Sequence, residues 1–206
     1  MRDYQLKNDV EILSHEIAFK RFYQMEIYRL RHRLFNGNWS EIITRDIANT
    51  GQVAAVLPYD PAHNKVVLIE QFRAGTLTDE KSPWQLEIVA GLQEVDEVKI
   101  ELAKRELKEE AGLDTTILMP IYRYWESPGA SNKQVDLYCG IIDSRDAGIE
   151  SLQGVAQEHE DIRVHVLDAE ESFQLVRDGF INNSLSIIAL QWLELSLLKA
   201  PQLLFK

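Results

Sequence analysis

Hydrophobic and polar residues alternate along the segment from residue 22 to residue 35, which contains the run YRLRHRLF. This period of two predicts a β-strand. The Asn36-Gly37 dipeptide that follows is typical of a tight hairpin turn, and a second strand is predicted over residues 41–47. The N-terminal part of the chain is therefore expected to form an antiparallel hairpin.

A second hairpin is predicted from the segments GQVAAVLPYD and KVVLIEQFRAG, which are joined by the turn sequence PAHN. The continuous apolar run VVLIE is typical of a strand at the centre of a sheet. Further strands are predicted over residues 115–125, 134–143 and 161–168. Most of the chain after residue 50 is therefore expected to contribute to one sheet.

Three segments carry the apolar spacing of helices. The first runs from about residue 98 to residue 111, with Ile100, Ala103 and Leu107 as its buried stripe and Gly112 as its C-terminal cap. The second covers residues 169–180, and a third, over residues 185–198, is apolar on most faces and is expected to pack in the core.

The second helix should begin with a capping box formed by Asp168 and Glu171. Mixed strands with three helices predict an α/β layered domain over residues 51–206. An N-terminal β segment over residues 1–50 is expected to precede that domain.

Composition and charge narrow the class of protein. The 206 residues are 45% hydrophobic, which is enough for a sizeable core. The chain has 22 Lys and Arg residues against 33 Asp and Glu residues, which argues against a binder of nucleic acid or of anionic membranes. No segment has the pattern of a signal peptide or of a membrane span. Cys139 is the only cysteine, so an intramolecular disulfide is excluded and the cytoplasm is the expected location.

The segment AKRELKEEAGL places three carboxylates on one helix face. Glu109 and Glu110 lie three and four residues after Glu106, and Glu106 and Glu110 repel each other as a like-charge pair one turn apart. A hard divalent cation such as Mg²⁺ would remove this repulsion, because it prefers carboxylate oxygens. The alternative is a solvated acidic helix in which Glu101 pairs with Arg105 and Arg105 with Glu109.

Extending this segment upstream gives GLQEVDEVKIELAKRELKEEAGL, which resembles the Nudix box. That pattern is Gly, five residues, Glu, seven residues, and then Arg-Glu-apolar-any-Glu-Glu-any-Gly-apolar. The matching positions are Gly91, Glu97, Arg105, Glu106, Leu107, Glu109, Glu110, Gly112 and Leu113. The resemblance implies a Nudix-type α/β/α sandwich with a mixed sheet, to which this chain adds an N-terminal antiparallel β hairpin segment.

Around the box, the resemblance narrows to the bacterial ADP-ribose pyrophosphatases. The segments SPWQLEIVAG, SPGAS, HEDIRVHV and LSIIALQWLEL are similar to that group. Pro128, fifteen positions beyond Leu113, matches the proline by which the ADP-ribose enzymes are told from other members. The resemblance implies hydrolysis of ADP-ribose to AMP and ribose 5-phosphate with Mg²⁺, or with Mn²⁺ in its place.

The same resemblance implies roles for the residues of the box. Glu106 and Glu110 match metal ligands, and the main-chain carbonyl of Ala90 is expected to complete their set. Glu109 and Arg105 are expected in supporting catalytic roles.

A second acidic segment, QEHED, follows later in the chain. The resemblance implies that Glu158 is the general base and that Glu160 is another metal ligand. His159 is the alternative base, since the unperturbed pKa of histidine lies near neutrality.

The resemblance also implies substrate contacts. Phe22 resembles an aromatic residue that stacks on the adenine, Arg45 and Arg73 resemble arginines that hold the phosphates and ribose, and Pro128 lies among the substrate-binding positions. In the family the N-terminal hairpin is exchanged between two subunits. A homodimer is therefore expected, in which Phe22 and Arg45 serve the partner's site.

Two departures from the family pattern affect loops. Asp96 stands where the family has Gly before the first glutamate of the box, and Ala130 stands where a second Gly often follows SPG. Both restrict conformations that glycine permits.

Two other functions stay open: hydrolysis of another nucleoside diphosphate sugar such as GDP-mannose, and binding of ADP-ribose without cleavage. The intact glutamates argue against the second.

Overall fold

The computed structural model describes residues 4–147, 153–154 and 160–199. Within it the chain forms two compact units. One contains the residues up to Gln52 together with Trp125–Gln134, and the other contains Val53–Tyr124 together with the residues from Val135 onward. The first unit holds a small antiparallel sheet and the second a larger mixed sheet.

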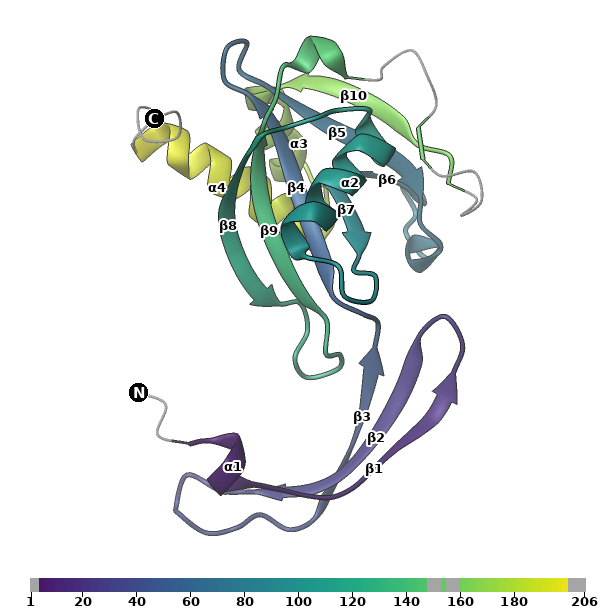
Figure 1. Ribbon diagram of the computed structural model, residues 1–206, viewed down its shortest axis with the longest axis vertical. Coiled ribbons are helices and arrows are strands. Elements are labelled where there is room, and N and C mark those ends of the chain that lie inside the picture. Colours follow the sequence, from purple (N-terminus) through teal and green to yellow (C-terminus); the bar gives the residue numbers. More distant parts are fainter. Residues whose placement is uncertain (1–3, 148–152, 155–159, 200–206) are drawn as a thin grey trace. The chain divides into compact units, whose positions relative to one another are not determined.

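In the N-terminal unit the described strands follow the order β1-β2-β3 (Figure 1). Its elements are the short helix α1 (Leu6–Asp9) and the strands β1 (Val10–Lys20), β2 (Gln24–His32) and β3 (Ile43–Asn49). The antiparallel pairing of β2 with β3 confirms the predicted hairpin. Between them, Gly37 has a φ of +85° and donates its N–H to the Leu34 carbonyl at 2.9 Å, as the Asn-Gly signal indicated.

Strand β1 was not predicted, because its sequence VEILSHEIAFK does not alternate regularly. The pairing register with β2 shifts between Ile12 and Ser14, and again between Ile17 and Phe19. Each shift inserts a residue that interrupts the alternation of side chains between the two faces. The unit is therefore a three-stranded sheet rather than the single hairpin that the pattern indicated.

The second unit is organised around a mixed sheet with the strand order β10-β5-β4-β9-β8, to which β6 is added beside β5 and β7 beside β4. Strands β4 and β9 are parallel, whereas β5 pairs antiparallel with β4, β6 and β10. The strands in the described residues are β4 (Val53–Asp60), β5 (Lys65–Phe72), β6 (Trp84–Glu87), β7 (Val89–Leu92), β8 (Ile117–Trp125), β9 (Gln134–Ile141) and β10 (Arg163–Asp168).

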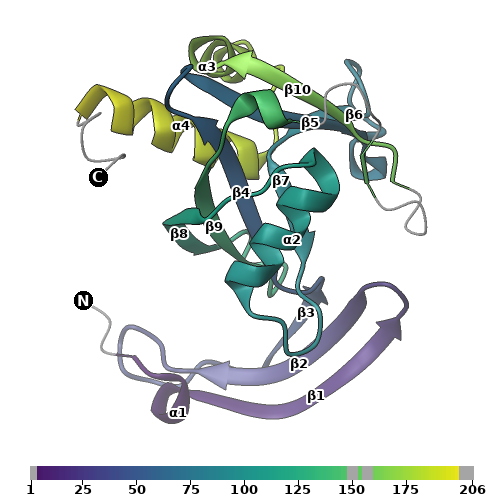
Figure 2. The same cartoon turned by 45° about the horizontal axis from the view of Figure 1, so that its top comes forward.

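Helices cover both faces of this sheet (Figures 1 and 2). Helix α2 lies on one face, and α3 and α4 lie on the other. The helices in the described residues are α2 (Lys99–Ala111), α3 (Ala169–Arg177) and α4 (Ser184–Lys199), with short 3-10 turns η1 (Ala74–Thr76) and η2 (Ser144–Asp146). This arrangement confirms the predicted α/β/α fold with a mixed sheet.

Strand β4 shows why the sheet separates two cores. All eight of its residues are buried, and alternate side chains point to opposite faces. Ala54 and Val56 pack in the core that contains helix α2, whereas Ala55 and Leu57 pack in the core that contains α3 and α4. Within the described residues, no helix is long and apolar enough to cross a membrane.

The structure corrects two details of the helix predictions. Ile100 is 40% exposed, and Leu102 takes its place in the buried face of α2. Asp168 makes no side-chain cap at the start of α3, because its carboxylate binds Lys65 Nζ at 2.9 Å instead. The C-terminal cap of α2 is confirmed: Gly112 has a φ of +70° and its N–H reaches the carbonyls of the last turn.

Candidate active site

The segment from β6 to β7 changes its strand partner at Ile88. Before this residue the chain pairs with β5, and after it the chain pairs with β4. Ser186 of α4 and Asn183, the residue before this helix, bind backbone groups of this segment. The Ile88 N–H donates to Ser186 Oγ at 3.0 Å, and Asn183 Nδ2 donates to the Leu86 carbonyl at 2.9 Å. These contacts hold β7 where it packs against α2.

Glu110 is the most deeply buried carboxylate of α2, with 2% of the residue exposed. The Ala90 N–H on β7 donates to Glu110 Oε2 at 3.0 Å. Burial raises the pKa of Glu110 well above its usual range, although the hydrogen bond from Ala90 opposes this shift. The structure thus places Ala90 and Glu110 together, while the role of the Ala90 carbonyl stays a prediction.

Glu106 lies one turn earlier and packs onto Gly91. A Cβ atom on Gly91 would lie 1.9 Å from Glu106 Oε1, so this carboxylate occupies the space that any other residue would fill. Burial raises the pKa of Glu106 to about 7; Arg105 lowers it, and the charges of Glu109 and Glu160 raise it further.

Arg105 connects the first glutamate of the box to the others. Its Nε and Nη2 donate to the two oxygens of Glu97 at 2.9 and 3.2 Å. Its Nη1 lies 2.9 Å from Glu109 Oε2 and 2.8 Å from Glu106 Oε1. Of the two ion pairs in the solvated-helix alternative, Arg105 with Glu109 is present, whereas Glu101 pairs with Lys104 instead of Arg105. One guanidinium therefore faces three carboxylates and offsets only part of their charge.

The second acidic segment is described only in part. Glu160 lies close enough to α2 for its charge to contribute to the raised pKa values of both Glu106 and Glu110. The proposed base Glu158 and its alternative His159 lie outside the described residues, so their positions are not assigned.

Arg73 is the residue that follows strand β5. Its Nε and Nη2 both lie 2.8 Å from Glu87 Oε2 on β6. Its charge lowers the pKa of Glu110, which places the guanidinium within electrostatic reach of the buried carboxylate. A cation at this position is suited to a phosphate group.

The other expected substrate residues belong to the N-terminal unit. Phe22 lies in the turn between β1 and β2 rather than in a strand, is 80% exposed, and contacts Tyr23 edge to face with 4.8 Å between ring centroids. Arg45 on β3 donates to the Thr44 carbonyl at 2.8 Å. Pro128 is an exposed residue of the turn after β8. Their contacts with substrate stay predictions.

The two departures from the family pattern differ in backbone conformation. Asp96 has a φ of +63°, the left-handed region that glycine adopts without cost and that aspartate tolerates better than most residues. Ala130 is not among the positive-φ residues of the described chain. Its N–H donates to Ser127 and its carbonyl accepts from Ala48, each at 2.9 Å. An alanine therefore fits its turn without strain.

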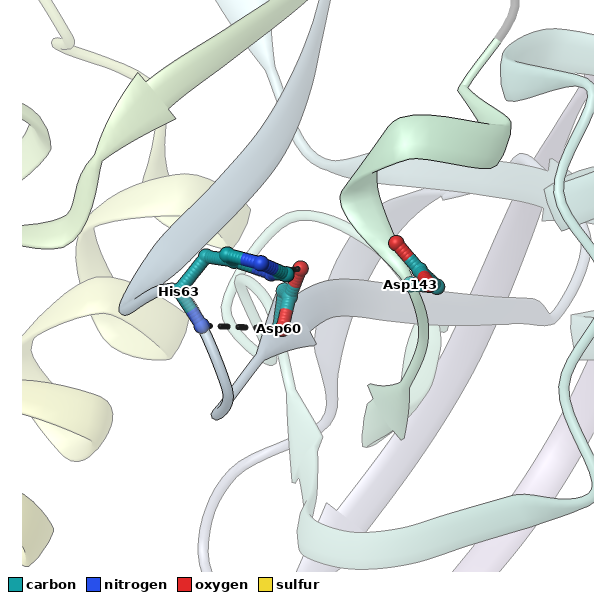
Figure 3. A group of neighbouring side chains, drawn as sticks. All are labelled: Asp60, His63 and Asp143. Carbon is teal, nitrogen blue, oxygen red and sulfur yellow. Dashed lines mark hydrogen bonds and ion pairs between the residues drawn. The ribbon is translucent and has the colours of Figure 1, made fainter.

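A second group of carboxylates, Asp60 and Asp143 with His63, lies at the other end of β4 and was not singled out from the sequence (Figure 3). Asp60 Oδ2 accepts hydrogen bonds from His63 Nδ1 at 2.8 Å and from the Ser144 N–H and hydroxyl at 2.9 and 2.7 Å. Burial alone would raise the pKa of Asp60, but these hydrogen bonds outweigh it and lower the pKa. Asp143 is bound to Arg145. These contacts join the β4–β5 turn to η2, which accounts for the group structurally.

The ligand atoms of Asp60, His63 and Asp143 all lie within 4.8 Å of one another, whereas the glutamates of α2 and Glu160 are candidate ligands by the chemistry of their oxygens. Glu106, Glu110 and Glu160 offer hard oxygen ligands, and their charges act on one another. Burial is the largest cause of the raised pKa values of Glu106 and Glu110, and the charges of neighbouring glutamates raise them further. A divalent cation held by these oxygens would offset this charge.

The comparisons with known proteins agree with this geometry. The family model described as NUDIX domain matches residues 49–199. The ADP-ribose pyrophosphatase of Escherichia coli (strain K12) is 43% identical over 189 residues, which cover 92% of this chain and 90% of that protein. The ADP-ribose pyrophosphatase of Haemophilus influenzae is 36% identical over 199 residues, covering 95% and 91%.

More distant matches carry other names. A GDP-mannose pyrophosphatase of Cronobacter sakazakii is 30% identical over 152 residues, covering 73% of this chain and 78% of that protein. A solved structure of an ADP compounds hydrolase superposes with a TM-score of 0.70 at 23% identity, covering 92% of this chain and 95% of that one. The solved structure therefore shares the fold of this chain. This chain belongs to the Nudix family.

The raised pKa of Glu106 predicts how stability depends on pH without metal. A pKa of about 7 in the folded state, against 4.5 for an unperturbed glutamate, means that the folded protein binds the extra proton between these values. The contribution of Glu106 to stability should therefore be complete below pH 4.5 and be lost as the pH rises through 7. In EDTA, this decline should be smaller in Glu106→Gln by on the order of 2 kcal/mol, measured by denaturant unfolding.

Glu101→Gln is the matched control, because Glu101 lies on the exposed face of the same helix. It should leave the wild-type pH dependence unchanged, and excess Mg²⁺ should remove the decline in the wild type. Parallel pH profiles for the wild type and Glu106→Gln would show that burial does not hold the proton on Glu106.

Proposed function

We propose that this protein hydrolyses the pyrophosphate bond of ADP-ribose to AMP and ribose 5-phosphate with bound Mg²⁺, for which Mn²⁺ can substitute. The observation that carries the proposal is the packing of Glu106 and Glu110 against Gly91 and Ala90, which places one half-buried and one buried carboxylate on one face of α2. The similarity to ADP-ribose pyrophosphatases over nine-tenths of both chains supports the choice of substrate.

The proposed ligands of the cation are Glu106, Glu110, Glu160 and the Ala90 carbonyl. When bound, the cation neutralises charge on the pyrophosphate and polarises the phosphorus that water attacks. The attacking water loses a proton, one bridging P–O bond breaks, and the bridging oxygen leaves with the other phosphate.

The chain's own groups have the remaining tasks. Glu158 is the proposed base that takes the proton from water. Arg105 holds Glu106 and Glu109 in place through the contacts at 2.8 and 2.9 Å, so that neither carboxylate swings into solvent. Arg73, fixed by Glu87, is positioned to bind a phosphate oxygen or the ribose.

The proposal assigns residues 1–50 to dimerisation and residues 51–206 to the catalytic domain. In the described part of the N-terminal unit only Glu26 is buried, so its sheet has no hydrophobic core of its own. Large apolar side chains are exposed along the sheet and its turns: Leu6, Ile12, Leu13, Ile17, Phe19, Phe22, Tyr23, Met25, Phe35 and Ile42. A sheet of this kind needs a covering surface. A second copy of the chain is the proposed cover, with Phe22 and Arg45 completing the partner's adenosine site beside Pro128.

Two points bear on the alternatives. The 30% identity to a GDP-mannose pyrophosphatase favours that substrate less than the higher identity favours ADP-ribose. A protein that binds ADP-ribose without cleaving it has no need of the complete set of Glu106, Glu109 and Glu110. The cytoplasm is the proposed location, because the lone Cys139 forms no intramolecular disulfide and fits a reducing compartment.

Glu110→Gln tests the metal site directly. The amide keeps the shape of the side chain but is a weak ligand for a hard cation, so kcat for ADP-ribose should fall by at least about 10²-fold. The melting temperature of the metal-free variant should not fall, because a like charge is removed. Glu101→Gln on the same helix is the control and should keep full activity. Near-normal turnover by Glu110→Gln would favour the solvated-helix interpretation.

Subunit complementation tests the shared site. A Phe22→Ala, Arg45→Ala chain and a Glu110→Gln chain should each be nearly inactive alone. After mixing and exchange, half of the dimers carry one intact site, so about one quarter of the wild-type activity should return. A monomeric mass by sedimentation, or no recovery after proven subunit exchange, would contradict exchange of the N-terminal segment.

A further inference from the structure

Gly154 lies beside Glu160 and precedes the second acidic segment, QEHED, in the chain. The neighbouring residue Gln153 forms an isolated antiparallel β-bridge with Ile162. The Gln153 N–H donates to the Ile162 carbonyl at 3.0 Å, and the Ile162 N–H donates to the Gln153 carbonyl at 3.2 Å. This bridge brings residues 153–154 alongside residues 160–162. Gly154 itself has a φ of +96°, a backbone conformation that L side chains rarely adopt.

The same glycine is bound to the end of helix α2. Its N–H donates to the Glu109 carbonyl at 3.0 Å. That carbonyl belongs to the last four residues of the helix, whose carbonyls have no partner within the helix. Gly112 caps the carbonyls of Leu107 and Lys108, so Gly154 supplies a donor that the cap does not.

Glu160 occupies the space that a side chain at position 154 would need. A Cβ atom on Gly154 would lie 2.8 Å from the Cβ of Glu160, and 3.3 Å from both Glu160 Oε2 and Ile162 Cδ1. The close atom is the Cβ of Glu160, which cannot move unless its backbone moves. Glycine is therefore required here for two independent reasons, its backbone angle and its lack of a side chain.

We propose that Gly154 is a positioning residue that docks the Glu160 backbone onto the C-terminal turn of α2 and so sets the Glu160 carboxylate beside Glu106 and Glu110. The effect of Glu160 on the pKa values of these two glutamates supports this placement. The consequence for turnover rests on the proposed function, but the consequence for metal binding does not.

Gly154→Ala tests the proposal through binding of Mn²⁺ alone, measured by electron paramagnetic resonance without substrate. Displacing Glu160 should weaken Mn²⁺ binding by about 10-fold, as is typical when a supporting partner of a metal ligand is lost. In turnover of ADP-ribose, the half-saturating Mg²⁺ concentration should rise by a similar factor, while KM at saturating Mg²⁺ should not change. Unchanged Mn²⁺ affinity would overturn the proposal.

Gly179→Ala is the matched control for backbone strain. Gly179 also has a positive φ, +69°, but the nearest atom to its Cβ would be Lys81 Nζ at an ordinary 3.6 Å. This variant should lose stability and keep the wild-type Mn²⁺ affinity. An equal loss of affinity in Gly179→Ala would reduce the role of Gly154 to general stability and contradict positioning.

A double variant separates action through Glu160 from other effects. Adding Gly154→Ala to Glu160→Gln should cause little further loss of Mn²⁺ affinity, because the group that Gly154 positions is already neutral. Additive losses would overturn the proposal. Mn²⁺ binding by the wild type without hydrolysis of ADP-ribose would contradict the proposed function and leave this inference standing.

Two further measurements apply if Gly154→Ala does not fold. Asparagine tolerates a positive φ but carries a Cβ, so Gly154→Asn should also weaken Mn²⁺ binding. In the unmodified protein, the Gly154 amide should exchange with deuterium as slowly as amides in the last turn of α2. Exchange at the rate of an unprotected amide would show that the bond to Glu109 does not hold.

Discussion

Glu106 and Glu110 lie one turn apart on α2 and are both largely removed from water, so the repulsion between their charges is a constraint on everything around them. Arg105 offsets part of it, through contacts with Glu106 and Glu109. The Ala90 N–H stabilises one oxygen of Glu110. Burial and, to a smaller extent, the remaining repulsion raise the pKa values of both glutamates. Without a cation, these two close carboxylates lower the stability of the folded protein. Binding of a cation between them is therefore favourable, and the proposed chemistry depends on that cation.

The fold supplies the precision that such a site needs. The glutamates come from one helix, but their partners come from β7, which is held in position by Ser186 and Asn183 from the opposite face of the sheet. Gly91 admits the Glu106 carboxylate, and Gly154 admits Glu160 at the end of the same helix. The positions of these glycines matter because a close approach of carboxylates leaves no room for a Cβ.

Much of this architecture follows from local sequence, and the exceptions have physical causes. The helix, its Gly112 cap and the carboxylate face could be predicted because helical spacing is a local property. Strand β1 was missed because two bulges interrupt its alternation. The capping box at Asp168 was wrong because Lys65, distant in sequence, takes the carboxylate. Gly154 carries no local signal, since its contacts with Glu109 and Glu160 exist only in the folded chain.

The most direct test of the central claim is turnover of ADP-ribose and of GDP-mannose, each measured with Mg²⁺ and with EDTA, with the products separated and counted. The account predicts equal amounts of AMP and ribose 5-phosphate from ADP-ribose, only with Mg²⁺, and a kcat/KM at least about 10-fold above that for GDP-mannose. Equal turnover in EDTA, or tight binding of ADP-ribose with no products in Mg²⁺, would contradict a metal-dependent hydrolase built on Glu106 and Glu110.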